Sequence, residues 1–174
     1  DVIDSYGGIC RADERIAQIS KRRGGVGLDI SPIRPKGLPT KNSAMTTDGI
    51  AVFMERFSNT SREVAQSGRR GALMISISVH HPEILTFIKS KIDLQKVTGA
   101  NISVRVTDEF MDAVKKNKMY EQKWPVDSNK PIVSQKVEAK KIWDELVNAN
   151  YKSAEPGILY WDTIIKNSPA DSYK

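Results

Sequence analysis

The chain has 174 residues, a formal net charge of +6 and a charged fraction of 28%. This length is enough for one domain with a substantial core, and the composition is ordinary for a soluble globular protein. No apolar run approaches the ~20 residues that cross a bilayer, and no signal-peptide pattern opens the chain, so we expect no membrane segment and a cytoplasmic location. The first residue, Asp1, is not methionine, which indicates a chain that was processed or cut from something longer.

The net positive charge favours anionic partners without choosing among nucleotides, nucleic acids and membrane surfaces. Aromatic residues are few and are not interleaved with the basic ones, which disfavours binding of single-stranded nucleic acid. Cys10 is the only cysteine, and this excludes an internal disulfide and a cysteine-based zinc site. Its place at the start of an amphipathic helix predicts a buried or half-buried thiol rather than a reactive one.

The chain is predicted to open with a helix that leads into a strand. Apolar residues recur at helical spacing over 9–19. Basic residues followed by glycine at 21–25 are typical of a helix C-terminus, and residues 26–30 then alternate like a strand.

Residues 32–48 carry prolines, glycines and polar residues, and a loop of this length is often functional. A second helix is predicted to start at Thr47 or Asp48 as its N-cap and to end before Gly68. The remaining pattern predicts, in chain order, a strand over 72–79, a short helix opened by His81-Pro82-Glu83, a strand over 102–106, a helix beginning at 107–109, an exposed polar excursion over 117–134, a helix over 137–149 and an extended segment over 154–160. Alternating helices and strands favour an α/β fold with largely parallel strands.

Two glycine clusters are the strongest functional signal, namely Gly24-Gly25-Val26-Gly27 and Gly68-Arg69-Arg70-Gly71. In both, a helical segment stops and a strand-like run begins. Bare glycine backbone beside arginine lets a chain approach a phosphate closely. The first cluster is neither a Rossmann fingerprint nor a P-loop, because it precedes a strand and no Gly-Lys-Ser/Thr closes it. The alternative is a pair of tight turns with solvated arginines.

The adjacent histidines His80 and His81 do not predict a metal site, because no carboxylate or thiol cluster accompanies them. Glu83 is better explained as a negative charge at a helix N-terminus. The three tryptophans are predicted to be packing anchors. From the residues alone, the chain is an α/β module that binds a phosphorylated ligand.

The order of several motifs resembles the large, catalytic subunit of ribonucleotide reductase across essentially the whole chain. The resemblance rests on Asp4-Ser5, Ile19-Ser20-Lys21, Gly24-Gly25-Val26-Gly27, Ile33-Arg34-Pro35-Lys36-Gly37, Gln66-Ser67-Gly68-Arg69-Arg70-Gly71-Ala72, His81-Pro82-Glu83-Ile84, Thr98-Gly99-Ala100-Asn101-Ile102-Ser103-Val104 and Ala154-Glu155-Pro156-Gly157. The amino-acid sequence at 69–71 and 97–101 is most similar to that of the adenosylcobalamin-dependent class, with the iron-dependent class as the alternative.

The resemblance implies that residues 1–174 are a single segment of a ten-stranded α/β barrel. It implies thiyl-radical reduction of ribonucleoside diphosphates or triphosphates, and control of substrate choice by deoxynucleoside triphosphate (dNTP) effectors. The implied cofactor is adenosylcobalamin bound outside this segment, or alternatively a di-iron partner subunit. A homodimer and a thioredoxin-type reductant are implied as partners.

Carried over residue by residue, the resemblance assigns Asp4 and Ser5 to the effector base or sugar, and Lys21 and Arg34 to the effector phosphates. The first specificity loop falls within 32–48, at 34–43.

The same resemblance places Gly24 and Gly25 against the substrate ribose. The second specificity loop, 66–72, contains Gln66, Arg69, Arg70 and Gly71, and we expect Gln66 and Arg70 to relay effector identity to the substrate base.

The family's redox cysteine pair and its Asn-x-Cys-x-Glu radical loop are absent from this sequence. We therefore assign no catalytic residue and expect the isolated chain to be inactive. Two alternatives stay open at this point. One is a free-standing deoxynucleotide-binding module without catalysis, and the other is a basic nucleic-acid-binding domain with strongly salt-dependent affinity.

Overall fold

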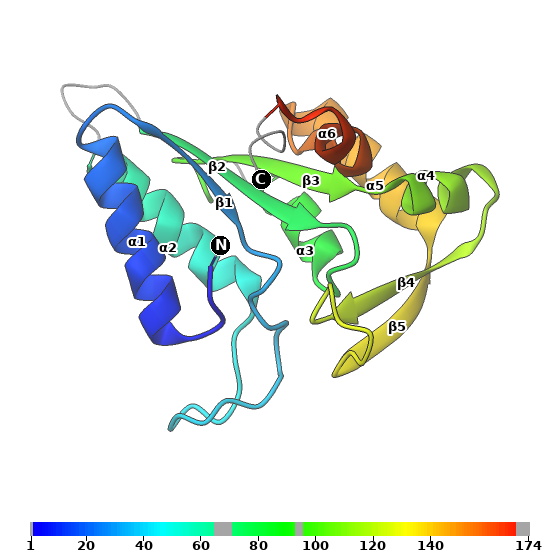
Figure 1. Ribbon diagram of the computed structural model, residues 1–174, viewed down its shortest axis with the longest axis horizontal. Helices are drawn as coiled ribbons and strands as arrows, with labels where there is room; N and C mark the ends of the chain where they lie inside the picture. Colours follow the sequence, from blue (N-terminus) through cyan, green and yellow to red (C-terminus); the bar gives the residue numbers. More distant parts are fainter. Residues whose placement is uncertain (1, 65–70, 93–95, 170–174) are drawn as a thin grey trace.

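The computed structural model describes residues 2–64, 71–92 and 96–169. Its centre is a four-stranded parallel sheet in the order β1-β2-β3-β6 (Figure 1). The strands are β1 (Gly25–Asp29), β2 (Ala72–Ser78), β3 (Asn101–Val106) and β6 (Gly157–Tyr160). The α/β fold with largely parallel strands is thus confirmed.

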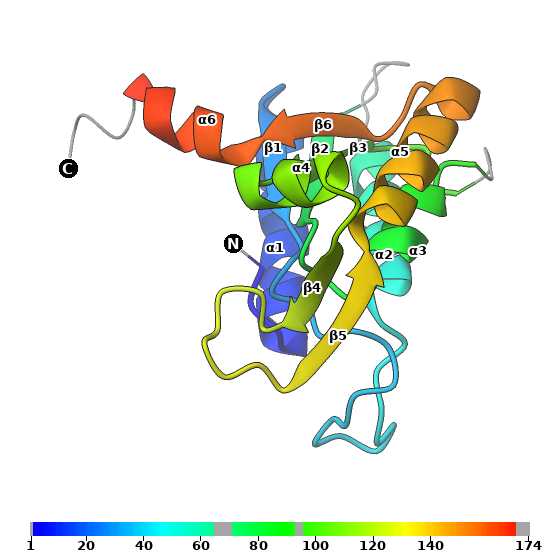
Figure 2. The ribbon, with the colours of Figure 1, turned by 90° about the vertical axis from the view of Figure 1, so that its right-hand side faces the viewer.

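The described helices are α1 (Tyr6–Ser20), α2 (Ile50–Glu63), α3 (Ile84–Lys89), α4 (Asp108–Lys115), α5 (Ala139–Ser153) and α6 (Trp161–Asn167). Helices α1 and α2 lie side by side and contact β1 and β2, while α3 packs against β2 and α5 (Figures 1 and 2). Helix α6 was not predicted. Within the described ranges, no helix has the length and apolarity needed to span a bilayer.

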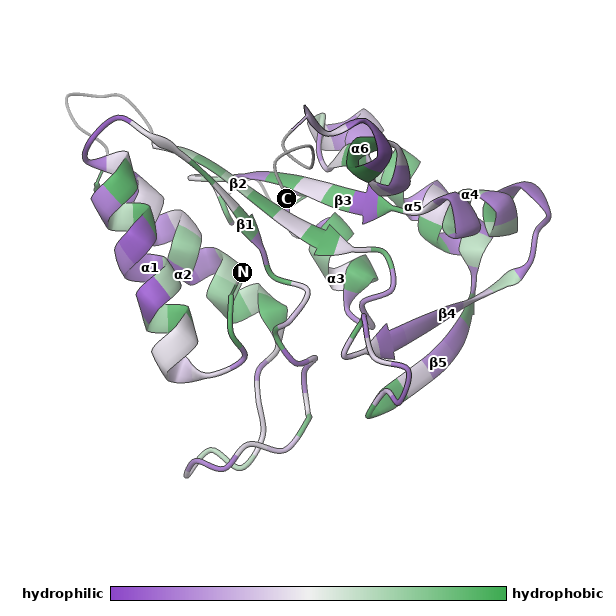
Figure 3. Ribbon diagram, in the orientation of Figure 1, coloured by the Kyte–Doolittle hydropathy of each residue, from purple (hydrophilic) through white to green (hydrophobic). Residues whose placement is uncertain are grey.

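The two faces of the sheet differ in character because side chains alternate along each strand. One face carries fully buried residues such as Ile75, Ile77 and Val104, which meet Phe57 and Phe87 of the helices. The opposite face carries small or polar residues at positions 27, 76, 103 and 157. In Figure 3 the green, apolar segments are prominent in β2, β3 and α3.

The predicted exposed excursion over 117–134 is wrong in part. It contains β4 (Met119–Trp124), which pairs in antiparallel fashion with β5 (Val133–Glu138). Along β4, the buried residues Tyr120, Gln122 and Trp124 alternate with more exposed ones. The strand is largely polar in Figure 3 because only one of its faces is covered. The average polarity of the segment 117–134 therefore hides the two-residue alternation that is typical of a strand.

The predicted N-cap of α2 is also wrong. Gly49 holds that position with φ +81°, and the Thr47 hydroxyl accepts only from the Gly49 amide, at 3.2 Å. The Ile50 amide donates instead to Oε2 of Glu83, at 3.0 Å. Glu83 is thus a negative charge at a helix N-terminus, as predicted, because it is the N-cap residue of α3. Its carboxylate, however, bonds to the first amide of α2 rather than to an amide of α3.

Cys10 is exposed rather than buried. The register of α1 turns Ile9, Ala12 and Ile16 toward the core. Residue 10 follows Ile9 by about 100°, a rotation that carries its side chain off the apolar stripe. Of the three tryptophans, Trp124 is 6% exposed and Trp143 is half-buried against the core, as expected of packing anchors.

Candidate functional site

Two residues assigned to the effector site, Asp4 and Arg34, bond to each other at the N-terminal end of α1. The Arg34 Nε lies 2.7 Å from Asp4 Oδ2, and the Arg34 amide donates to Asp4 Oδ1 at 3.1 Å. Ser5 is the N-cap of α1, where its hydroxyl accepts from the Gly8 amide at 3.1 Å. These three residues therefore form one corner, which we call the arginine corner.

Arg34 is held from two further sides. Its Nη1 donates to the Pro39 carbonyl, and its guanidinium carbon lies 5.9 Å from the centre of the Trp124 ring. The Trp124 indole donates in turn to the Pro32 carbonyl, at 3.1 Å. No local pattern indicated this role of Trp124, because Trp124 and Pro32 are 92 positions apart in the chain. The arrangement presents a preformed guanidinium, the group best suited to bind phosphate.

Residues 32–48 leave this corner as an arm that extends away from the body of the molecule (Figures 1 and 2). The two limbs of the arm bond to each other, since Gly37 N donates to Thr47 O at 2.9 Å and Thr47 N donates to Leu38 O at 3.0 Å. An isolated bridge pairs Pro39 with Thr46 further out. The predicted long loop is thus an ordered two-limbed arm with Arg34 at its base.

Lys21 lies at the opposite end of α1 from the arginine corner. It is the C-cap of this 15-residue helix, and a rise of 1.5 Å per residue separates the two ends by about 22 Å. The structure therefore brings Asp4, Ser5 and Arg34 together and leaves Lys21 apart within one copy.

The first glycine cluster and Gly71, the one described residue of the second cluster, lie at the edge of the sheet where β1 and β2 begin. Gly25 pairs with Ala72, the first residue of β2. A side chain at Gly24 would lie 2.6 Å from Cγ2 of Ile19, so this glycine is needed for close packing. The left-handed residue of the turn is Arg23, with φ +65°.

Of the second specificity loop, Gln66, Arg69 and Arg70 lie outside the described residues. Gly71 is described, and a side chain there would lie 2.7 Å from the Ser61 hydroxyl and 3.5 Å from that of Ser20. Both hydroxyls are buried, and neither has a hydrogen-bond partner among the described residues. These serines at the base of the loop were missed, since nothing in a single helix pattern distinguishes them from ordinary surface serines.

The face of the sheet opposite the helices carries an ion pair that sequence reasoning also missed. Arg105 Nη2 lies 2.8 Å from Asp29 Oδ2 and 2.9 Å from the Ser31 hydroxyl. The guanidinium carbon stacks over Trp161 at 4.6 Å. The serines of β2 and β3 alternate with apolar residues, and this alternation was the available signal for a polar face.

Two neighbouring side chains join the arm to the end of β2. His81 is fully buried, and burial lowers its pKa from the ordinary 6.5 to about 4, against the opposing effect of its bond to the Ile33 carbonyl. Burial raises the pKa of the Glu83 carboxyl, while hydrogen bonds from the Ile50 and Lys36 amides lower it. The neighbouring histidine also has a hydrogen-bond partner, since His80 Nε2 lies 3.0 Å from the Tyr120 hydroxyl.

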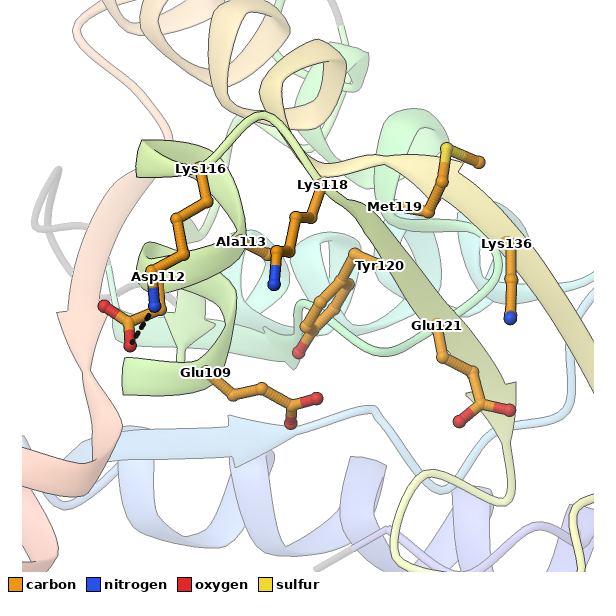
Figure 4. A pocket seen from close by; sticks show the side chains of 9 residues that line it. All are labelled: Glu109, Asp112, Ala113, Lys116, Lys118, Met119, Tyr120, Glu121 and Lys136. Carbon is orange, nitrogen blue, oxygen red and sulfur yellow. Dashed lines mark ion pairs between the residues drawn. The ribbon is translucent and has the colours of Figure 1, made fainter.

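A pocket of about 360 Å³ lies between α4 and β4 (Figure 4). Its charged lining is Glu109, Asp112, Lys116, Lys118, Glu121 and Lys136, equal in acidic and basic groups. Asp112 and Lys116 neutralise each other across 3.7 Å. It contains none of the residues predicted from the sequence, and its balanced charge gives no preference for an anionic ligand.

Comparison with known proteins identifies the family of the chain. The family model described as "Ribonucleotide reductase, barrel domain" matches residues 1–174. A "Vitamin B12-dependent ribonucleoside-diphosphate reductase" of Thermoplasma acidophilum is 33% identical over 168 residues, covering 95% of this chain and 22% of that protein. The protein of the same name in Mycobacterium tuberculosis is 28% identical over 95% of this chain and 23% of its own length.

A "Ribonucleoside-diphosphate reductase large subunit" of variola virus is 27% identical over 95% of this chain and 25% of that protein. The chain thus spans a quarter or less of the length of these relatives. The chain belongs to the ribonucleotide reductase family, and it matches that family's barrel domain.

Proposed function

We propose that this chain is the effector-binding and substrate-adjacent part of a ribonucleotide reductase catalytic subunit. In the complete enzyme, which would reduce ribonucleotides by thiyl-radical chemistry, the segment would bind a dNTP effector at the arginine corner. The observation that carries this proposal is the guanidinium of Arg34, oriented by Asp4 at 2.7 Å and by Trp124 at the base of an ordered arm. A preoriented guanidinium loses little side-chain entropy when it binds phosphate.

The start of the sheet would hold the substrate. Gly24 and Gly25 would place bare backbone against the ribose. Because Gly25 pairs with Ala72, the described end of the second specificity loop, Gly71 and Ala72, lies beside them. We propose that Gln66, Arg69, Arg70 and Gly71 contact the substrate base. An effector that biases such a loop by ~1–3 kcal/mol changes substrate preference about fivefold or more.

A complete effector site would need two copies of the chain. Within one copy, a single nucleotide would have to span the length of α1, about 22 Å, to meet both the arginine corner and Lys21. We propose that Lys21 reaches the effector phosphates from a second copy in a homodimer. A closed two-fold dimer would form two such sites.

The relatives' names favour cobalamin over a di-iron partner subunit. No group of three or more His, Cys, Asp or Glu side chains that could hold a metal ion comes together among the described residues, so these residues do not fit a di-iron site. Cys10 is exposed on α1, and His81 bonds to the Ile33 carbonyl. We place the radical-generating cofactor, and the contacts of a thioredoxin-type reductant, outside this segment.

The test is substitution in a complete reductase that contains this segment. Lys21→Ala and Arg34→Ala each remove a charged phosphate contact, worth roughly 1.5–3 kcal/mol. We expect the dNTP concentration for half-maximal effect to rise at least about tenfold, with little change in turnover without effector. Lys141→Ala, which removes an exposed lysine of α5, is the control. An unchanged effector response in both variants would show that the site assignment is wrong.

A further inference from the structure

The segment His81–Glu83 contacts both ends of the 32–48 arm. His81 Nε2 lies 2.9 Å from the Ile33 carbonyl oxygen at the start of the arm. Glu83 Oε2 accepts from the Lys36 amide at 3.1 Å and from the Ile50 amide, directly after the arm, at 3.0 Å. One short stretch of chain therefore bonds three backbone groups that bracket the arm.

The two side chains act together. The Glu83 amide donates to His81 Nδ1, at 3.1 Å. That nitrogen must then be an acceptor, so the proton of the neutral ring sits on Nε2 and is donated to the Ile33 carbonyl. The low pKa of His81 agrees with a ring that stays neutral near pH 7. His81 thus fixes the backbone of Glu83 while it holds the first limb of the arm.

Gly49 provides the space that the Glu83 carboxylate occupies. A side chain at position 49 would lie 2.5 Å from Oε2 and 2.6 Å from Oε1. The backbone of Gly49 has φ +81°, a conformation that favours glycine. The glycine that ends the arm is therefore matched to the carboxylate that caps α2.

We propose that Glu83, oriented by His81, is a positioning residue that holds the two ends of the 32–48 arm in the geometry that receives the effector. The inference rests on the proposed function of the arginine corner. It adds a residue that touches neither effector nor substrate. Arg34 lies between Ile33 and Lys36, whose backbone groups bond to His81 and Glu83. Loss of either bond would therefore let the backbone of Arg34 move and displace its guanidinium.

A plain helix cap would explain only part of this geometry. Capping of α2 requires the bond to Ile50, whereas the second bond, to Lys36, contributes nothing to that helix. The burial of Glu83 is also unfavourable in free energy, because burial disfavours the charged form of the carboxyl and raises its pKa. The two explanations differ in what a substitution changes. Loss of a cap lowers stability, whereas loss of an anchor raises the effector concentration that is needed.

The experiment compares Glu83→Gln with the parent in the complete reductase. Glutamine keeps the shape of the side chain and one acceptor oxygen, but it replaces the charged hydrogen bonds to the Lys36 and Ile50 amides by weaker neutral ones. We expect the concentration of dATP, dGTP, dCTP or dTTP for half-maximal effect to rise at least about tenfold, with substrate KM and turnover without effector within about twofold of the parent. Gly49→Ala, which displaces the carboxylate, should shift the effector concentration in the same direction. Glu109→Gln, an exposed glutamate of α4, is the matched control.

Backbone amide exchange in the same enzyme tests the anchor directly. In the parent, the amides of Lys36 and Ile50 should exchange slowly. In Glu83→Gln the segment 34–50 should exchange faster, while β3 keeps its protection. Fast exchange of Lys36 in the parent would overturn the anchor without any variant.

The outcomes separate the two claims. A parent that responds to effector, with an equally responsive and folded Glu83→Gln, overturns the positioning role alone. A parent that responds to none of the four nucleotides overturns the proposed function and, with it, the role of Glu83 in effector binding.

Discussion

Single polar residues in this chain are fixed by partners that lie far away in sequence. His81 bonds to Ile33 and Arg34 to Asp4, across 48 and 30 positions. Each of these bonds joins the arm to a different segment of the chain. Their strength depends on protonation and on exclusion of water, which makes residue-scale tests possible.

The first test concerns the pH dependence of stability. The pKa of His81 is lowered from 6.5 to about 4 in the folded state, so the unfolded state binds a proton first. The associated stability is present above pH 6.5 and is lost as the pH falls toward 4. At pH 4 the loss amounts to about 3 kcal/mol. Urea unfolding of the protein and of the non-titrating His81→Gln variant at pH 7 and pH 4 measures it.

The shift of Glu83 has the opposite sign. Its pKa is raised, so protonation at low pH favours the folded state. This contribution is common to the protein and to His81→Gln, and the comparison between them cancels it. If the two proteins lost equal free energy of unfolding between pH 7 and pH 4, His81 would not be buried in the neutral form.

Trp124 allows a second test at this scale. Trp124→Phe removes the bond to the Pro32 carbonyl and weakens the contact with Arg34. We expect a loss of roughly 1–2 kcal/mol in the free energy of unfolding. Trp143→Phe removes a similar volume from a half-buried indole for which no hydrogen bond is described. Equal losses from both substitutions would contradict a specific role for Trp124.

At the scale of elements, α1 contains two adjacent glycines with opposite roles. A side chain at Gly7 would meet nothing within 4 Å, whereas at Gly8 it would lie 2.5 Å from Cβ of Ile3. Gly7→Ala should stabilise the protein by about 0.5–1 kcal/mol through helix propensity. Gly8→Ala should destabilise it by roughly 1–3 kcal/mol through overpacking. Thermal or urea unfolding of the two variants checks both signs, and stabilisation by Gly8→Ala would contradict the close contact with Ile3.

At the scale of the whole molecule, Lys21 and the arginine corner test the assembly. We expect the Lys21→Ala and Arg34→Ala reductases each to lose effector response. If the site is shared between copies, mixing the two variants and letting subunits exchange restores roughly a quarter of the sites. Effector titration of the mixture measures the recovery. A mixture as unresponsive as its components would place both residues in the site of one copy.

The sequence by itself determined the class of fold. Helical spacing over 9–19 and alternation in the strands are local patterns, and burial of one face makes each of them readable. The ordered motifs also determined the family, which the match over residues 1–174 confirms. The roles of Asp4, Ser5, Lys21, Arg34 and the two specificity loops stay predictions.

Only the tertiary structure decided which groups meet. It paired Asp4 with Arg34, placed Lys21 at the far end of α1, and gave the cap of α2 to Glu83, 33 positions away from Ile50. It also showed that 117–134 contains β4, which pairs with β5, and that Cys10 faces outward. The physical reason is the range of the interactions. Periodicity and capping preferences act within a few residues, whereas these bonds form only after distant segments have packed together.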